Sequence, residues 1–420
     1  MLRLLLALVL AVPNLVFAVE FDIYQSDYRP LKLAWVTLAD EQHSEQQALL
    51  RHVVRDDLES SRSFSALNPL GFLADAESTV QQVEYSDWRI IGADFLATCA
   101  LSQEAGQWYA DVQIHDVFQS KLLSSQRLSQ PASSLRLLAH EVANHIYQAA
   151  TGIVGHFTTS VLYVRKRGDF ADLVYMDQDG AGKQDVARNF TLLLSPDWDA
   201  SKRFVALNTY VGNRPRLETL ELATGERRTF GAFSGLNSTP AWSPDGHYIA
   251  ATLSYKGNAD IHLYDTRTAS WRQLTTNSTI DTTPSWSPDG QQLAFTSNRN
   301  GRPHIYRLRL ADLQVQRVSS VGDYNTSAAW SPRGDRIAFI TRKNGEFALA
   351  TMNIDGSDIR YLLTGGRIES PVWSPNAQMI LFAREVRGLR RVFRIPSWGG
   401  EAEAITPINE DASDPAWSRR

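Results

Sequence analysis

The segment Asp281-Thr-Thr-Pro-Ser-Trp-Ser-Pro-Asp-Gly290 decides the fold, because related segments recur along the chain. Each copy carries a tryptophan followed by serine. These tryptophans are Trp242, Trp286, Trp330, Trp373 and Trp417, spaced 44, 44, 43 and 44 residues apart. We expect a weaker sixth copy at Leu193-Leu-Ser-Pro-Asp197, with Leu194 in the place of the tryptophan. A period of this length is typical of the four-stranded blades of a β-propeller.

The repeat that begins at Pro284 predicts four strands. A short first strand leads into the turn Pro288-Asp-Gly290, where proline fixes φ and glycine accepts a positive φ. Residues 292–297 and 304–309 alternate apolar and polar side chains, as half-buried strands do. Residues 314–318 form a fourth, edge-like strand. Each repeat therefore predicts one small antiparallel sheet.

The two ends of the repeat region each hold an incomplete repeat. The chain stops three residues after Trp417, whereas residues 160–164, 172–176 and 185–189 resemble second, third and fourth strands without a first one. Joining the ends completes six sheets and removes open sheet edges that favour aggregation. We therefore predict an all-β, six-bladed β-propeller over residues 156–420, closed by pairing of residues 415–418 with 160–164.

Residues 1–18, MLRLLLALVLAVPNLVFA, have the pattern of a secretory signal peptide. Arg3 supplies a positive start, nine apolar residues follow from Leu4, and Val16 and Ala18 suit a cleavage site. The apolar run is shorter than the roughly 20 residues that span a bilayer. We expect a mature protein that starts near Val19, lies outside the cytoplasm and has no membrane span.

Residues 19–155 lack the repeat and predict a smaller N-terminal α/β domain. Residues 31–37, 94–102 and 108–118 have strand patterns, with a turn at 104–106 between the last two. Apolar residues at helical spacing indicate a helix over 44–60, and Ser133 or Ser134 could cap a second helix that runs to about residue 150. Gly152 then ends this helix and opens the link to the propeller.

Composition excludes several functions. The formal net charge of −4 and the absence of a block of like charges give no indication of a nucleic-acid partner. Cys99 is the one cysteine, so neither an internal disulfide nor a cysteine zinc cluster can form. Its apolar neighbours predict a small buried side chain.

No sequence motif predicts catalysis. His140 and His145 are five positions apart and so lie about 140° apart on a helix, whereas a zinc protease needs a spacing of four. Residues 177–180 resemble the start of a calcium loop but lack its later ligands, so we interpret them as a hairpin turn. The chain has neither a nucleophile elbow nor a phosphate-binding loop. We expect no enzyme activity, no catalytic residue, no metal and no cofactor.

Two parts of the chain together resemble the TolB family of the Tol-Pal system. One is the junction from Leu138-Ala-His-Glu-Val-Ala-Asn-His-Ile-Tyr147 through Thr151-Gly-Ile-Val-Gly-His-Phe157 to the strand at 161–164. The other is Leu293-Ala-Phe-Thr-Ser-Asn-Arg-Asn-Gly-Arg-Pro303, within the WSPDG-type repeats. The resemblance extends over essentially the whole mature chain.

Resemblance to this family implies a periplasmic monomer that supports outer-membrane invagination during cell division and envelope integrity. It implies that the propeller binds the peptidoglycan-associated lipoprotein Pal. It also implies that the mature N-terminal segment contacts the third, C-terminal domain of TolA, through residues such as Glu20, Phe21, Ile23 and Tyr24. Gln25 departs from the family pattern, which has a glycine near this position.

In the family, Pal docks on the propeller face formed by the loops that enter the first strands. The resemblance therefore predicts a Pal-binding rim, which consists of Leu236, Asn237, Thr239, Asp281, Thr282, Thr283, Tyr324, Asn325, Thr326, Arg367, Glu369, Asp411 and Asp414.

An alternative function is a propeller that binds a small molecule or sugar at its channel mouth. Such a site gathers aromatic rings and carboxylates, and Asp281, Tyr324, Glu369 and Asp414 are candidates. A propeller-gated hydrolase is excluded, because it needs a separate domain of about 200 residues with a nucleophile elbow.

Overall fold

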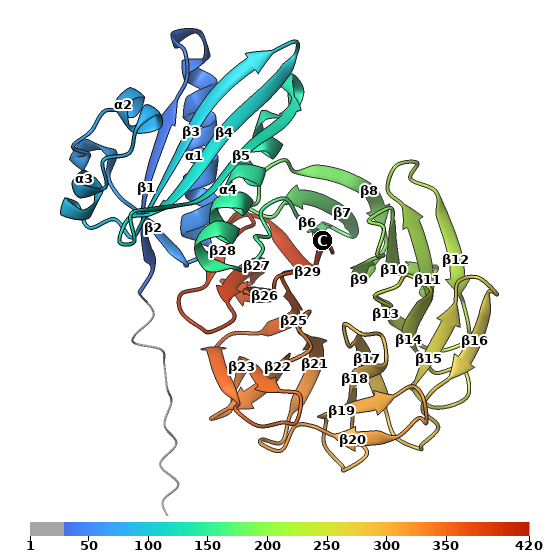
Figure 1. Ribbon diagram of the computed structural model, residues 1–420. Helices are drawn as coiled ribbons and strands as arrows, with labels where there is room; N and C mark the ends of the chain where they lie inside the picture. The colour runs from blue at the N-terminus through green and yellow to red at the C-terminus, as the bar shows by residue number, and fades with distance from the viewer. Residues whose placement is uncertain (1–28, 420) are drawn as a thin grey trace, which may run out of the picture.

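The computed structural model describes residues 29–419, which form an N-terminal α/β domain followed by a six-bladed β-propeller (Figure 1). The predicted fold class is confirmed. The signal peptide and the TolA-contact segment, including Glu20, Phe21, Ile23 and Tyr24, lie outside the described residues. Among residues 29–419, no helix is both long and apolar enough to cross a bilayer.

The N-terminal domain is a five-stranded sheet in the order β2-β1-β3-β4-β5 with helices on both faces. Its elements are β1 Leu31–Leu38, η1 Glu41–His43, α1 Ser44–Ser60, β2 Phe64–Ala66, η2 Pro69–Gly71, α2 Ala76–Gln81, α3 Tyr85–Ile90, β3 Phe95–Glu104, β4 Gln107–Asp116, β5 Lys121–Pro131, η3 Ala132–Ser134 and α4 Leu135–Thr151.

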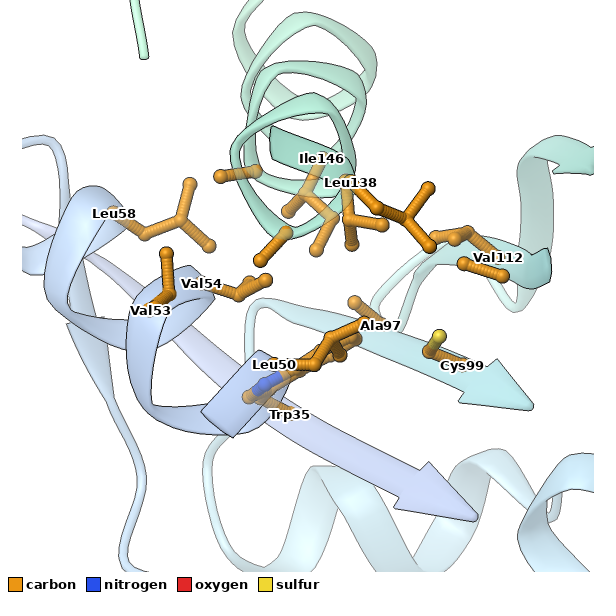
Figure 2. Packing of buried hydrophobic residues seen from close by; sticks show 14 of the residues in the cluster. Trp35, Leu50, Val53, Val54, Leu58, Ala97, Cys99, Val112, Leu138 and Ile146 are labelled. Atoms are coloured by element: carbon orange, nitrogen blue, oxygen red, sulfur yellow. The ribbon is translucent and has the colours of Figure 1, made fainter. Parts of the chain in front are cut away.

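Helices α1 and α4 cover one face of this sheet. Figure 2 shows Val54 of α1 and Leu138 and Ile146 of α4 meeting over Ala97 and Val112 of the sheet. Burying such side chains stabilises the fold by about 1.5–3 kcal/mol each. The single cysteine, Cys99, lies in the same core, and burial raises the pKa of its thiol to about 12. This thiol is therefore an apolar core group.

The propeller consists of six four-stranded antiparallel sheets. Blade 1 holds β29 Asp411–Trp417, β6 Ser160–Arg167, β7 Phe170–Asp177 and β8 Gln184–Phe190. Blade 2 holds β9 Leu193–Trp198, β10 Phe204–Val211, β11 Arg214–Glu221 and β12 Arg227–Gly231, and blade 3 holds β13 Asn237–Trp242, β14 Tyr248–Leu253, β15 Asp260–Asp265 and β16 Ser270–Gln273. Blade 4 holds β17 Asp281–Trp286, β18 Gln292–Ser297, β19 His304–Arg309 and β20 Val315–Arg317, blade 5 holds β21 Asn325–Trp330, β22 Arg336–Lys343, β23 Glu346–Asn353 and β24 Arg360–Thr364, and blade 6 holds β25 Ile368–Trp373, β26 Met379–Val386, β27 Leu389–Pro396 and β28 Glu403–Ala404.

The last strand of the chain, β29, completes blade 1. It pairs antiparallel with β6, and Trp417 lies opposite Val161 while Asp411 lies opposite Lys166. The Trp417 indole donates a 2.7 Å hydrogen bond to Thr159 Oγ1, and the Ser160 amide donates a 2.9 Å bond to Ser418 Oγ. The ring is therefore closed by noncovalent contacts between its first and last residues.

A tryptophan ends the first strand of every blade, and its ring packs between blades. The indoles of Trp198, Trp286 and Trp373 each donate a hydrogen bond to a main-chain oxygen of the preceding blade. In blade 2 this tryptophan is Trp198, which pairs with Val205 and stands 44 residues before Trp242. Placing Leu194 at this position was therefore wrong.

The domain junction depends on two glycines. Gly152 has a φ of 73° and ends α4, as a glycine after a helix does. Gly155 lies so close to Asn144 that a Cβ on it would stand 2.9 Å from the Asn144 Cα. The same Asn144 accepts a 2.9 Å hydrogen bond from the Phe157 amide, so α4 holds the start of the propeller at a fixed position.

Candidate functional site

The first strands of all six blades begin on one face of the propeller, which we call the distal face. The N-terminal domain contacts the opposite face, since Gln178 and Asp179 follow the end of β7 and Asn376 follows the end of β25. The interdomain hydrogen bonds of Gln178, Asp179 and Asn376 therefore all lie on the face opposite the distal face. The predicted rim residues lie on the distal face.

A cavity of about 450 Å³ occupies the propeller axis. In each blade the third residue before the tryptophan lines it, which gives a channel ring of Ser195, Thr239, Thr283, Ser327, Ser370 and Asp414. All six have a positive φ of 47–55°, and the strand pairing slips at the same point in every blade. A positive φ costs a non-glycine residue roughly 1 kcal/mol or more. The slip in pairing is a β-bulge that recurs in every blade, and it holds these side chains toward the axis in spite of that cost.

Hydroxyl groups link neighbouring blades around the channel. Thr239 and Thr252 share a 2.9 Å hydrogen bond, and the Thr252 hydroxyl also accepts a 3.3 Å bond from the Thr283 amide. The next blade repeats the pattern, because Thr283 bonds Thr296 and the Ser327 amide donates to Thr296. Blades 3, 4 and 5 therefore share a connected polar surface along the channel.

Two carboxyl groups also line the channel. Burial raises the pKa of Asp197 to about 6 and raises the pKa of Asp414 above its ordinary value. Asp197 accepts a 2.6 Å bond from the Trp242 amide, and Asp414 accepts a 3.2 Å bond from the Ser195 amide. Arg419 stands at the opposite end of the channel and donates to the main-chain oxygens of Trp242 and Ser243.

Three predicted rim residues are buried and cannot touch a partner in this structure. Asn237, Asp281 and Asn325 each begin a first strand, and each is fully buried. Their side chains bond a residue four positions earlier, Phe233, Asn277 and Val321 respectively. They close the loops of the distal face, and the predicted contact role does not fit them.

The other rim residues reach the surface of the distal face. Leu236, Thr239, Thr282, Thr283, Tyr324, Thr326, Glu369, Asp411 and Asp414 are half-buried, and Arg367 is exposed. Three of these rim residues already have ion-pair partners, since Arg367 contacts Glu369 and Arg390 contacts Asp411 at 2.9 Å. The rim is thus a polar surface with partly neutralised charges.

Sequence reasoning missed the apolar side chains of the same loops. Ile280, Val321 and Ile408 precede first strands and are 52%, 39% and 68% exposed. Val386 and Leu389 are exposed on the neighbouring hairpin of blade 6. Exposed apolar groups around a polar surface mark protein-binding faces, and their sequence signal is an apolar residue within a short polar loop.

A second polar cluster joins the two domains. Asp57 of α1 accepts a hydrogen bond from Gln178 of the propeller at 2.8 Å and lies 2.6 Å from His140 Nδ1. Arg136 of α4 bonds Asp177 and Asp179 of the propeller. His145 instead contacts Ser124, which separates the two histidines as their spacing predicted. Oxygen and nitrogen atoms of Asp57, His140 and Asp179 lie within 4.8 Å of one another, which is close enough for a metal site. Arg136 already neutralises Asp179, however, so we interpret the group as an interdomain contact.

Both titratable groups of this contact hold protons more tightly than usual. Burial raises the pKa of Asp57 from 3.8 to about 6. Burial alone would lower the pKa of His140, but the hydrogen bond and charge of Asp57 outweigh it and raise that pKa above 6.5. The buried pair therefore retains a proton near neutral pH.

We expect the domain contact to weaken as the pH rises from acidic values to above neutrality. The pKa values of Asp57 and His140 are both raised in the folded protein. The stabilisation is therefore complete below the pKa values that these groups have in the unfolded chain. It is lost as the pH rises through about 6 and then through the pKa of His140. Thermal melting at about pH 6 and about pH 8.5 measures the loss. A His140→Gln variant should lose most of this pH dependence, and an equal dependence in both proteins would contradict the assignment.

Two families of known domains match the chain. The TolB amino-terminal domain matches residues 19–123, and the TolB beta propeller domain matches residues 147–420. A Tol-Pal system protein TolB from Alcanivorax borkumensis is 35% identical over 210 residues, which cover 49% of this chain and 48% of that protein. The match thus spans about half the length of this curated relative.

Solved structures show the same architecture. The crystal structure of TolB from Acinetobacter baumannii has a TM-score of 0.86 and 29% identity, and the match covers 93% of this chain and 97% of that one. A chain of a nidogen/laminin complex has a TM-score of 0.52 and 10% identity, with 62% and 98% coverage, and so shares the propeller fold alone.

Proposed function

Because this chain belongs to the TolB family, we propose that it is the periplasmic TolB component of a Tol-Pal system and acts by binding other proteins. Tol-Pal TolB proteins are not enzymes. In this proposal the distal face binds the lipoprotein Pal, and the segment with Glu20, Phe21, Ile23 and Tyr24 contacts the C-terminal domain of TolA. The complex then supports outer-membrane invagination during division.

One observation carries the Pal assignment. The distal face combines exposed Ile280, Val321 and Ile408 with a rigid ring of hydroxyl groups, and the described N-terminal domain lies against the opposite face. Apolar anchors surrounded by polar groups are what a protein partner needs, and a rigid scaffold lowers the entropy cost of binding. The channel ring offers side chains at six similar positions, so the partner can engage several blades at once.

The direct test is calorimetric titration of the mature protein with the soluble domain of Pal. We expect Ile280→Arg to weaken binding roughly tenfold or more, because loss of a central apolar contact costs over about 1.4 kcal/mol. Thr283→Arg should act similarly by filling the channel mouth. Leu313→Arg is the matched control, since Leu313 is also exposed but lies in the β19–β20 turn on the opposite face.

Unchanged Pal affinity in both Ile280→Arg and Thr283→Arg would remove the distal face from the proposal. Equal weakening by Leu313→Arg would have the same meaning, because it would show that the effect is not local. Far-ultraviolet circular dichroism on each variant checks that the propeller remains folded.

The axial cavity favours a second candidate function, binding of a small polar molecule. Its volume of about 450 Å³ lies within the range of ligand sites. Asp414 reaches it, whereas Asp281 is held by Asn277 and Arg299 and does not. Saturable binding of a monosaccharide that a Thr239→Met variant abolishes would support this function.

A further inference from the structure

A second cavity, of about 290 Å³, lies between blades 5 and 6 on the face opposite the distal face. It is independent of the proposed Pal contact. Its walls include Arg333, Arg336, Arg360, Asn353, Ser397 and Trp398. Three guanidinium groups in one small cavity are unusual for a protein of net charge −4.

The first arginine occupies a position that blades 3 and 4 use for an aspartate. In blades 3 and 4 the turn residue after Ser-Pro is Asp245 or Asp289, and it accepts a bond from the preceding serine. In blade 5 this position is Arg333, and Asp335 accepts the 2.9 Å bond from Ser331 instead. The Arg333 side chain is thus free of the turn's hydrogen bonding. Among residues 29–419 its guanidinium has no ion pair.

The second arginine is fixed in place by the protein. Arg336 is 14% exposed at its side chain and bonds Asn353 Oδ1 at 2.9 Å and Asp358 Oδ2 at 2.8 Å. Its Nε is buried and has no hydrogen-bond partner within the described residues. Its Nη2 donates to Thr351 Oγ1 at 3.1 Å and to the main-chain oxygen of Asp358 at 2.7 Å, so Arg336 contributes a fixed positive charge to the cavity.

The charges of the cavity leave an excess of positive groups. Arg360 shares Asp358 with Arg336, at 2.7 Å. Asp335 is engaged in its turn, so three guanidinium groups face two carboxylates that already have partners. Guanidinium groups bind carboxylate and phosphate oxygens with paired hydrogen bonds.

We propose that this cavity binds an oxyanion, either a carboxylate or a phosphate group, between Arg333, Arg336 and Arg360. Trp373 and Trp398 also line the cavity. An indole in the lining suits a flat group next to the oxyanion. The ligand class is therefore a small organic acid or phosphate ester that carries a ring or chain.

The test is titration of the full mature protein, at constant ionic strength, with acetate, benzoate, inorganic phosphate and phenyl phosphate. We expect saturable binding of at least one pair, with a dissociation constant of about 1 mM or lower. The ring-bearing member should bind more tightly, and Trp398→Ala should remove that advantage. The comparison of acetate with phosphate identifies the oxyanion.

Arg333→Gln should weaken the binding roughly tenfold, because it removes a charge-assisted hydrogen bond. Arg333 is exposed, and within residues 29–419 its guanidinium forms no ion pair, so this variant should fold normally. Arg214→Gln is the matched control, since Arg214 is an exposed arginine at the start of β11. Absence of saturable binding by all four probes, or equal binding by Arg333→Gln and the wild type, would overturn the proposal.

Discussion

Removal of residues 411–420 is expected to destroy the cooperative thermal unfolding of the propeller. The deletion takes away β29, which is the innermost strand of blade 1 and the partner of β6. Blade 1 then exposes the edge of β6, and the core cluster formed with Ala412 and Trp417 opens to water. An unpaired edge also favours association between chains. We expect aggregation or a melting temperature lower by tens of degrees.

A point substitution measures the same closure more gently. Trp417 is 5% exposed and packs among Val161, Met379 and Leu381. Trp417→Ala should cost about 3–5 kcal/mol, as large core truncations do. For a domain of this size the loss lowers the melting temperature by roughly 10 °C.

Truncation after Ser418 is the control for both variants. It keeps β29 and the Ser160–Ser418 hydrogen bond and removes only the last two residues. Within the described residues Arg419 contacts Trp242, Ser243 and Asp197. We expect a small change, because no strand residue is removed. If the protein lacking residues 411–420 melts like this control, the ring does not depend on β29.

Asp57→Ala is expected to detach the N-terminal domain from the propeller. The Asp57 carboxylate is 1% exposed and is the shared partner of His140 and Gln178, which come from different domains. Its removal leaves two buried polar groups without their acceptor. Breaking a buried pair in this way costs about 3–5 kcal/mol. In differential scanning calorimetry, the two domains of Asp57→Ala should unfold in two separate transitions. The wild type should show less separation between them, because its domains are coupled more strongly.

Asp56→Ala is the matched control on the same helix. Asp56 is the neighbouring residue, half of its side chain is exposed, and its partners His52 and Arg55 are on the surface. Exposed pairs contribute about 0–1 kcal/mol, so this variant should melt like the wild type. Proteolysis at residues 152–159 should accelerate in Asp57→Ala alone, and equal rates in the two variants would contradict the assigned role of the cluster.

The sequence predicted the fold well because its signal is periodic. The 44-residue spacing of tryptophans indicated blades, and apolar spacing indicated helices at 44–60 and near 135–150, which are α1 and α4. The error at Leu194 arose because serine-proline pairs occur on both sides of the tryptophan, as in blade 6 with Pro371 and Pro375. Strand pairing, which a single sequence does not state, assigns the position to Trp198.

Other features depend on tertiary contacts that leave a weak local signal. Strand β5 was missed because it is an edge strand with mostly exposed side chains on both faces. The burial of Asn237, Asp281 and Asn325 follows from how each closes the loop before it, and short polar loops look alike in sequence whether their side chains point inward or outward. The three arginines of blade 5 and Trp398 of blade 6 meet only in the folded ring.

The way the ring closes also decides how the molecule carries a pulling force. The N-terminal domain is attached to β6 at Ser160, beside Trp417, whereas the rest of the ring is attached to β29 at Asp411, at the far end of the same pair. A force that draws the domains apart slides β6 along β29, and the hydrogen bonds lie across that direction. They share the load in shear and do not open one after another. The closure is therefore strongest against tension applied through the N-terminal domain.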